Sequence, residues 1–272
     1  MSRHEIEALG KTRVVIEDGK VVEVGEPLVK YCPLFHKHRG IEEITPEIVR
    51  KNVEFRMKDF GMCCPERKLR MHDFLSFGVS ELMGMSITKG MLDCAVIVCE
   101  GAGTVVIEDP EVVQGIGGRI SGVIRTSPIP EVIEEIGINR VLDPLGAKID
   151  QVMGAFKAQA MGYQKIGVSV ATGHDAEVLR HEFGNHVVLF AVHTTLLSED
   201  DSRSLFEHCD IISACASRNV RAEAQKRDVM KVGNKIPIYA VTETGKMILE
   251  TRMTQIKDKR VEGEEDPPRP LI

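Results

Sequence analysis

The side chains with the widest chemical repertoire in this sequence are its seven cysteines. Cys99 and Cys215 each end a short apolar run, whereas Cys32 and Cys63 lie in polar stretches nearer the N-terminus. Four thiolates gathered from distant segments can hold an iron–sulfur cluster or a zinc ion. We therefore take Cys32, Cys63, Cys99 and Cys215 as candidate metal ligands, although the sequence holds no Cys-x-x-Cys pair that would specify such a site.

The remaining cysteines suggest simpler roles. Cys94 and Cys209 precede apolar runs, and we expect both to pack in the core. Cys64 directly follows another cysteine and belongs to no recognisable motif. A single reactive thiolate at Cys99 or Cys215 is the alternative to a metal site, because the thiolate is the nucleophilic form of cysteine.

His193 is a candidate catalytic residue, together with Cys215. It directly follows the apolar run Val187–Val192, so it would stand at the end of a strand. A histidine there can act as a general base or as a metal ligand. Glu100 and Asp143 also follow apolar runs and are possible partners for it. A hydrogen-bonded structural histidine is the alternative.

Two glycine clusters are candidates for binding an anion. Glycine allows backbone N–H groups to approach a phosphate or carboxylate closely, and a nearby arginine can neutralise its charge. Neither cluster matches a P-loop or a dinucleotide fingerprint, and tight turns are the alternative interpretation. The candidate binding residues are Gly101, Gly103, Thr104, Gly115, Gly117, Gly118 and Arg119.

The elements that must position these residues follow a repeating pattern from about residue 90 onward. Short apolar runs alternate with amphipathic helices of about ten residues, which is typical of a parallel sheet covered on both faces. We therefore predict an α/β fold with a mostly parallel, Rossmann-like sheet; a closed barrel is the alternative. The runs are Ala95–Cys99, Gly122–Ile124, Arg140–Leu142, Ile166–Val170, Val187–Val192, Ile211–Cys215 and Ile236–Val241, and the helices are Pro130–Ile136, Ile149–Met161, Asp175–Glu182, Glu199–His208 and Val220–Lys231.

A different organisation is predicted before and after this region. Thr12–Val24 reads as a β-hairpin around Asp18-Gly19, since that pair suits a type I′ turn. Thr45 and Pro46 then open a helix that ends near Gly61. We predict an N-terminal hairpin and helical segment over residues 1–70 and an α/β core over residues 71–256, whose first helix begins near Pro65 or Met71. The charged, proline-rich residues 257–272 should form a disordered tail.

Composition narrows the classes of function. The formal net charge is −6, which argues against a nucleic-acid partner and against an anionic membrane surface. No apolar run approaches the roughly 18 residues of a membrane span. The polar N-terminus lacks the apolar core of a signal peptide. We therefore expect a cytoplasmic protein, in which the cysteines stay reduced.

Several long stretches resemble methanogenesis marker protein 8, an archaeal family, and the resemblance extends to about residue 250. It implies a methanogenic archaeon and a link to methanogenesis, but it carries no established reaction and no known site residues. The stretches are IEALGKTRVVIEDGKVVEVGEPLVKYCPLFHKHRGI, FRMKDFGMCCPERKLRMHDFLSFGVSE, CAVIVCEGAGTVVIEDPEVVQGIGGRISGVIRTSPIPEVIE, VLDPLGAKIDQVMGA, FAVHTT and ISACASRNVR.

Three hypotheses of function follow. The first is a maturation or assembly factor of methanogenesis with a metal or iron–sulfur site at the four candidate cysteines. The second is an enzyme that acts on a small anionic cofactor precursor at the carboxyl ends of the strands. The third is an interaction protein without a site of its own, which joins other methanogenesis proteins through its N-terminal segment; an exposed apolar patch around Pro33–Phe35 or Phe74–Phe77 would favour it.

Overall fold

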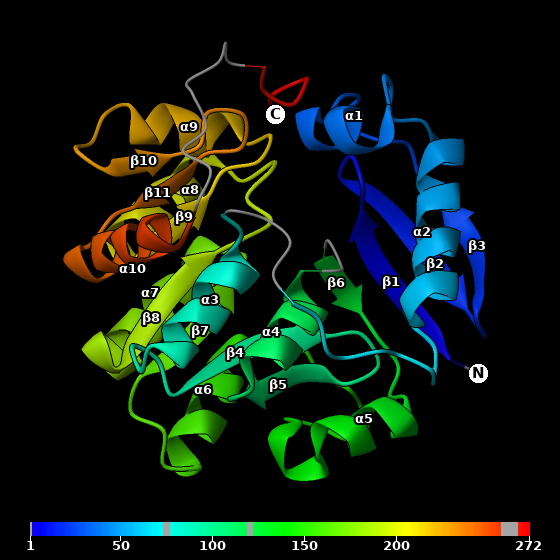
Figure 1. Cartoon of the computed structure of the whole chain (residues 1–272), viewed down its shortest axis with the longest axis horizontal. Coiled ribbons are helices and arrows are strands. Elements are labelled where there is room, and N and C mark those ends of the chain that lie inside the picture. The colour runs from blue at the N-terminus through cyan, green and yellow to red at the C-terminus, as the bar shows by residue number, and fades with distance from the viewer. Residues whose placement is uncertain (1, 73–76, 119–121, 257–265) are drawn as a thin grey trace.

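The computed structural model describes residues 2–72, 77–118, 122–256 and 266–272 (Figure 1). The strands in these ranges form a four-stranded sheet and a seven-stranded sheet. The chain is therefore an α/β protein, as predicted, but its strands are divided between two separate layers. None of the helices in the described ranges is long and apolar enough to cross a membrane.

The smaller sheet is built mainly from the N-terminus. Its strand order is β3-β2-β1-β6, and all of its neighbours are antiparallel; the strands are β1 (Arg3–Ala8), β2 (Thr12–Glu17), β3 (Lys20–Val24) and β6 (Gly122–Arg125). The hairpin predicted at Asp18-Gly19 joins β2 to β3, and both turn residues have positive φ, as the type I′ geometry requires. The predicted run at Gly122 is a strand, but it pairs with β1 here and does not join the larger sheet.

Two helices accompany this sheet. Helix α2 (Pro46–Phe60) begins where the sequence predicts, because the Thr45 hydroxyl accepts a hydrogen bond from the backbone N–H of Ile48. It ends at Gly61, which adopts the left-handed conformation. Its apolar side packs on the sheet and forms a core with residues of β1 and β2. Helix α1 (Pro33–Arg39) precedes it.

The larger sheet is mixed, which corrects the prediction of a mostly parallel, Rossmann-like sheet. Its order is β10-β11-β9-β8-β7-β4-β5, an open arrangement. Only β4, β7, β8 and β9 are parallel to one another, while β5 and β11 pair antiparallel to their neighbours. The strands are β4 (Cys94–Cys99), β5 (Gly103–Ile107), β7 (Ile166–Val170), β8 (Val187–Ala191), β9 (Ile211–Ser213), β10 (Met230–Val232) and β11 (Ile238–Ala240).

The physical reason for the mixed sheet is the length of its connections. Strands β4 and β5 are joined by only three residues, and so short a turn can connect only antiparallel strands. At the opposite edge, β10 and β11 form a second antiparallel pair. The predicted strand at Arg140–Leu142 is absent; a short helical turn occupies Ile138–Arg140, and Val141 makes a single bridge to Val105.

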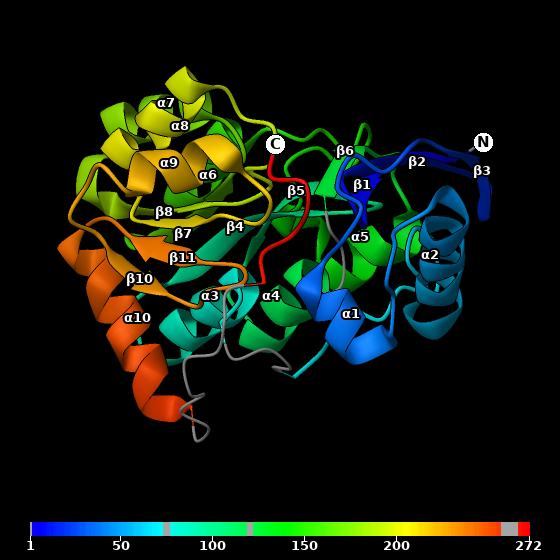
Figure 2. The ribbon, with the colours of Figure 1, turned by 90° about the horizontal axis from the view of Figure 1, so that it is seen from above.

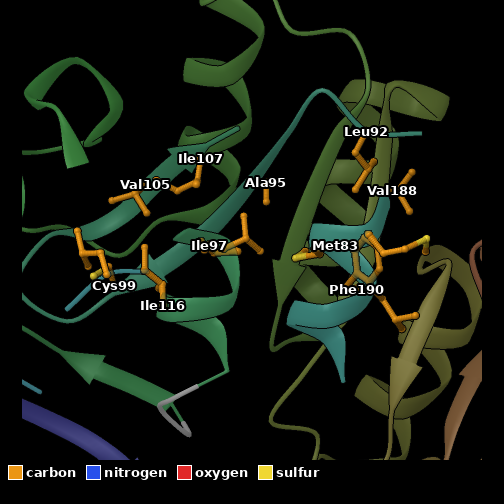
Figure 3. Close-up of a cluster of buried hydrophobic side chains, with 14 of the residues drawn as sticks. Met83, Leu92, Ala95, Ile97, Cys99, Val105, Ile107, Ile116, Val188 and Phe190 are labelled. Carbon is orange, nitrogen blue, oxygen red and sulfur yellow. The ribbon is translucent and has the colours of Figure 1, made fainter. Parts of the chain in front are cut away.

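Helices cover both faces of the larger sheet (Figure 2). Buried side chains of α3, α4 and α10 pack against one face, and those of α6, α7, α8 and α9 pack against the other. Figure 3 shows the first of these cores, in which Met83 of α3 lies beside Phe190 of β8. The helices are α3 (Val79–Thr88), α4 (Pro110–Gly117), α5 (Pro130–Ile136), α6 (Gln151–Ala160), α7 (Gly173–Phe183), α8 (Glu199–His208), α9 (Arg218–Ala224) and α10 (Glu243–Gln255).

Two helix predictions need correction, and one segment differs from expectation. Helix α3 begins only at Val79, and the predicted first turns overlap residues 73–76, which lie outside the described ranges. Helix α9 ends at Ala224, because the chain turns there and continues into β10. Residues 266–272 were expected to be disordered, but they lie against the folded protein and form a bridge with Tyr31. The rest of the expected tail lies outside the described residues.

Candidate functional site

The carboxyl ends of the parallel strands lie beside strand β1 of the smaller sheet. Successive side chains of a strand point to opposite faces of the sheet. The two faces of β1 therefore contact two different groups of polar side chains. Glu7 reaches His193, two residues beyond the end of β8. His4 contacts the segment after β4 through Thr126, whose hydroxyl binds the backbone N–H of Gly101.

The first group is an acid–base cluster of Glu7, His193 and Lys11. The Glu7 carboxylate lies 3.6 Å from Nδ1 of His193 and 2.6 Å from Nζ of Lys11. All three side chains are partly exposed, His193 by 32% and the other two by 20% each. Because solvent reaches this cluster and its charges are adjacent, it can exchange protons with a bound molecule.

The position of His193 is held by the backbone around it. His193 has a φ of +56°, a left-handed conformation that is uncommon for a residue with a side chain. The next residue, Thr194, is buried, and its hydroxyl donates a hydrogen bond to the carbonyl of Ser213 on β9. Gly122 leaves room for the ring, since a Cβ there would lie 3.1 Å from Cε1 of His193. Strained backbone of this kind is concentrated at functional sites.

The charge of Glu7 is stabilised by its neighbours. Burial works to raise the pKa of Glu7, but the proximity of His193 and the ion pair with Lys11 outweigh it and lower the pKa below the usual range. Glu7 is therefore ionised at neutral pH. An ionised carboxylate beside Nδ1 favours the histidine tautomer with the proton on that nitrogen and leaves Nε2 as the basic atom.

Two predicted cysteines lie close to this cluster. Cys215 follows β9 and is half-buried; burial raises the pKa of its thiol to about 12, and the nearby thiol of Cys32 and the charge of Glu7 act in the same direction. Arg221 donates a 2.8 Å hydrogen bond to the backbone carbonyl of Cys215 and so fixes this turn. Cys32 caps the start of α1, and burial also raises the pKa of its thiol. Both thiols are protonated at neutral pH.

The second group is a buried ion pair between Arg67 and Glu100. Nε of Arg67 lies 2.5 Å from Oε1 of Glu100, and both side chains are fully buried. The same guanidinium donates to the carbonyls of Lys68 and Gly115, at 2.5 and 2.9 Å. It also stacks 4.8 Å above the ring of Phe60. Each of the three guanidinium nitrogens therefore has a hydrogen-bond acceptor. The role of Arg67 is to balance the negative charge of Glu100 inside the protein.

Two further cysteines and a histidine surround this ion pair. Burial raises the pKa of both Cys63 and Cys99 well above the usual range, with Glu100 contributing in each case. His4 is buried beside them, and burial lowers its pKa, so the ring is neutral. Its Nδ1 lies 2.6 Å from the Thr126 hydroxyl, and its Nε2 has no hydrogen-bond partner within the described ranges.

The predicted set of four metal ligands divides between these two groups. Cys63 and Cys99 belong to the buried ion pair, and Cys32 and Cys215 belong to the acid–base cluster. Among the described residues, which include all four cysteines, no three or more histidine, cysteine or acidic side chains are arranged to hold a metal ion. The arrangement therefore gives no support to an iron–sulfur or zinc site. Cys94 and Cys209 are buried in the core.

Close packing accounts for most of the glycine clusters. A Cβ at Gly103 would lie 2.3 Å from the carbonyl oxygen of Ala147, and one at Gly115 would lie 1.8 Å from that of Leu69. Thr104 is also engaged, because its hydroxyl donates to Gln151. Gly101 supports the β4–β5 turn with a φ of +86°, Gly117 contacts Ser80, Gly118 caps α4, and Arg119 lies outside the described ranges. Anion binding at these glycines stays a prediction.

The partner of His193 differs from both candidates considered from sequence. Glu100 is paired with Arg67, and Asp143 accepts hydrogen bonds from backbone N–H groups of its own turn. Glu7 takes this place from a distant strand. The only signal in the sequence was its place in the alternating stretch Glu5-Ile6-Glu7-Ala8, which does not distinguish Glu7 from Glu5.

A hollow of about 380 Å³ lies at the surface near the second group. Its walls include the hairpin turn at Asp18, the cysteines Cys63 and Cys64, and the start of α5 at Pro130. Cys64 is half-buried there, so its thiol is accessible from this side of the molecule. The hollow therefore offers a surface thiol, that of Cys64, which does not belong to the acid–base cluster.

Comparison with known proteins places this chain among archaeal proteins. Residues 4–254 match the model of a family described as "Uncharacterized protein conserved in archaea (DUF2099)". The chain is also 40% identical, over 283 aligned residues, to an uncharacterized protein of Methanocaldococcus jannaschii, and the alignment covers all of both chains. That relative comes from a methanogen, which agrees with the biological setting implied by the sequence.

Proposed function

We propose that this chain, which belongs to the DUF2099 family of uncharacterized archaeal proteins, is an enzyme that transfers a proton to or from a small molecule at the carboxyl ends of β8 and β9. The observation that carries the proposal is the pair of Glu7 and His193, 3.6 Å apart. The pair lies where ligands bind in open α/β sheets, beyond the carboxyl ends of the strands.

The chemistry follows from the roles that the two side chains can take. Glu7 holds the proton of His193 on Nδ1, so Nε2 is the atom that accepts a proton from the substrate. The imidazolium that forms is stabilised by the adjacent carboxylate, and the proton is returned from Nε2 later in the reaction. Glu7 is thus a positioning residue, and His193 is the general base.

The surroundings favour an anionic substrate. Lys11 flanks the pair, and Arg218 and Arg221 lie in the turn and helix that follow β9. A phosphate or carboxylate on a cofactor precursor would suit these cations. The methanogenic relative supports a place for the reaction in the metabolism of such archaea.

The two other hypotheses have less support. A maturation factor that carries a cluster on four cysteines needs those thiols in one ligand set, and they divide into two pairs. An interaction protein would need an exposed apolar patch at the N-terminal segment. Pro33 is buried, Phe35 and Phe77 pack against the cores, and Phe74 lies outside the described residues.

A metabolite-consumption assay tests the proposal and can also identify the substrate. The purified protein is incubated anaerobically with a small-molecule extract of a methanogen, and mass spectrometry follows which compounds disappear. We expect one anionic compound to be consumed by the unaltered protein, not by the His193→Ala variant, and more slowly by Glu7→Gln. The matched control is His181→Ala, because His181 is 83% exposed and pairs with Glu182. Equal consumption by His193→Ala, or no consumption at all, would contradict the proposal.

A further inference from the structure

Residues Asp266–Ile272 form a segment that lies between the elements of the smaller sheet and those of the larger sheet (Figure 2). At its first contact, the segment pairs with Tyr31. The backbone N–H of each of Tyr31 and Arg269 donates to the carbonyl of the other at 3.0 Å, and the N–H of Lys30 donates to Arg269 at 2.7 Å. The Arg269 guanidinium lies 4.1 Å above the Tyr31 ring, and the Tyr31 hydroxyl donates to Asp266.

At its other end, the segment binds the loops that follow β8 and β9. The backbone N–H of Ile272 donates to the carbonyl of Ala216 at 2.8 Å. The carbonyl of Ile272 accepts from the N–H groups of Arg218 and Leu196, at 3.0 and 3.4 Å. The Arg218 guanidinium also donates to the carbonyl of Leu271 at 2.9 Å. The segment therefore contacts both halves of the molecule through its backbone.

The contact points adjoin the residues of the proposed active site. Tyr31 precedes Cys32, Ala216 follows Cys215, and Leu196 is three residues beyond His193. The thiols of Cys32 and Cys215 lie near each other on the two sides that the segment connects. The segment thus binds residues that adjoin the acid–base cluster on both sides.

The segment is held more weakly than the core elements. Of its seven residues only Pro268 is buried, and Arg269 is exposed. Its attachment depends on backbone hydrogen bonds, on two hydrogen bonds from the side chains of Tyr31 and Arg218, and on one stacked arginine. Such regions open with a lower free energy than strands and helices of a core.

We infer that Asp266–Ile272 is a strap that covers the loops at the ends of β8 and β9, and that it must leave its position before a substrate can reach His193. The inference rests on the proposed function, because it concerns the access of a substrate to the same site. The strap occupies donors and acceptors of the two strand-end loops that a ligand would otherwise use. Its departure exposes the thiols of Cys32 and Cys215 together.

Thiol accessibility in the full chain tests the strap. Arg269→Pro removes both the N–H that bonds Tyr31 and the guanidinium that stacks on its ring. The protein is treated anaerobically with iodoacetamide, and peptide mass spectrometry follows the rate at each cysteine. We expect Cys32 and Cys215 to react about tenfold faster or more in the variant, because release restores solvent to both thiols. Cys64 reports on a distant surface and should not change.

Two further controls make the result decisive. Arg203→Ala removes an exposed arginine of α8 and should leave all rates unchanged. A synthetic peptide with the sequence of Asp266–Ile272, added to the Arg269→Pro variant, should restore slow labelling. Unchanged rates at Cys32 and Cys215 in Arg269→Pro, or no protection by the peptide, would overturn the inference.

A measurement on the unaltered protein covers the case in which the variant fails to fold. Hydrogen exchange should show the Arg269 and Ile272 amides protected, yet exchanging at least tenfold faster than the amides of β8. Unprotected amides, or amides as slow as those of β8, would refute a releasable strap. The labelling and exchange assays need no enzymatic turnover. They can therefore support the strap when the metabolite assay fails, and they can refute the strap when the metabolite assay succeeds.

Discussion

The buried pair of Arg67 and Glu100 gives the strongest test of the structure, because changing one member leaves the other as an isolated charge. Glu100→Gln keeps the size and shape of the side chain and removes its negative charge. The guanidinium of Arg67 is fully buried and stays protonated, since an arginine does not lose its proton in a protein. The variant must therefore keep an unpaired cation in its interior.

The magnitude follows from the burial of the pair. Removing one partner of a buried ion pair costs about 3–5 kcal/mol of folding free energy. The hydrogen bonds of Arg67 to the carbonyls of Lys68 and Gly115 remain, so we expect the lower part of this range. An unfolding entropy of about 2.1 cal/mol/K per residue then gives a fall in Tm of roughly 5–7 °C for this chain.

Thermal unfolding of three variants checks this expectation. Asp200→Asn breaks an ion pair with Arg203 in which both side chains are largely exposed, and it should change Tm little. The double variant Arg67→Met/Glu100→Leu removes both charges and should recover most of the loss, because well-packed apolar side chains replace a buried ion pair at little cost. If Glu100→Gln shifts Tm no more than Asp200→Asn does, the pair is not buried as described.

Three other predictions concern packing, pH and thiol reactivity. Gly115→Ala should lower the unfolding free energy by about 2 kcal/mol or more in urea, because its Cβ would lie 1.8 Å from the Leu69 carbonyl; a loss below about 0.5 kcal/mol would contradict this packing. The pKa of Glu7 is lowered despite its burial, chiefly by His193, so its stabilising effect is present above its ordinary pKa and disappears as pH falls through the lowered value. Glu7→Gln should therefore lose less stability than the unaltered protein between pH 5 and pH 3, and equal losses would count against the pairing. Burial raises the pKa of Cys94 to about 12, so iodoacetamide at pH 8 should label it more slowly than the half-buried Cys64, and equally rapid labelling would place it outside the core.

The elements with strong local signals could be predicted from sequence. The hairpin at Asp18-Gly19 needs only two residues with positive φ, and Pro130–Ile136 and Glu199–His208 are helices with the predicted bounds. Each of these signals lies within the element or beside it. Local chemistry is sufficient to place such elements, whatever the rest of the chain does.

The pairing of strands was harder to predict, because it depends on residues far apart in the chain. Strand β6 lies among the elements of the core in sequence, yet β1 is its partner in the other sheet. Strand β5 begins at Gly103, inside a stretch whose glycines suggested an anion-binding loop. The turn at Gly101 is so short that β5 must run antiparallel to β4.

The candidate site shows the same division between local and distant information. The rule that ligands bind at the carboxyl ends of strands selected His193 and Cys215 from their positions alone. It could not select Glu7, because Glu7 lies on a strand of the other sheet and the rule concerns only the strands of a single sheet. The four cysteines illustrate the converse: each lies at a plausible position, but distance in the fold separates them into two pairs.

Strand β1 explains why two chemically different groups occur on either side of one segment. His4 and Glu7 are three residues apart, so they point to opposite faces of the strand. The face of His4 is sealed by α2 and lies against the buried ion pair, which keeps that ring neutral. The face of Glu7 meets the strand ends and retains enough solvent for an ionised carboxylate. A shift of β1 by one residue would reverse both environments at once, so the register between β1 and β2 controls the acid–base cluster as directly as His193 itself does.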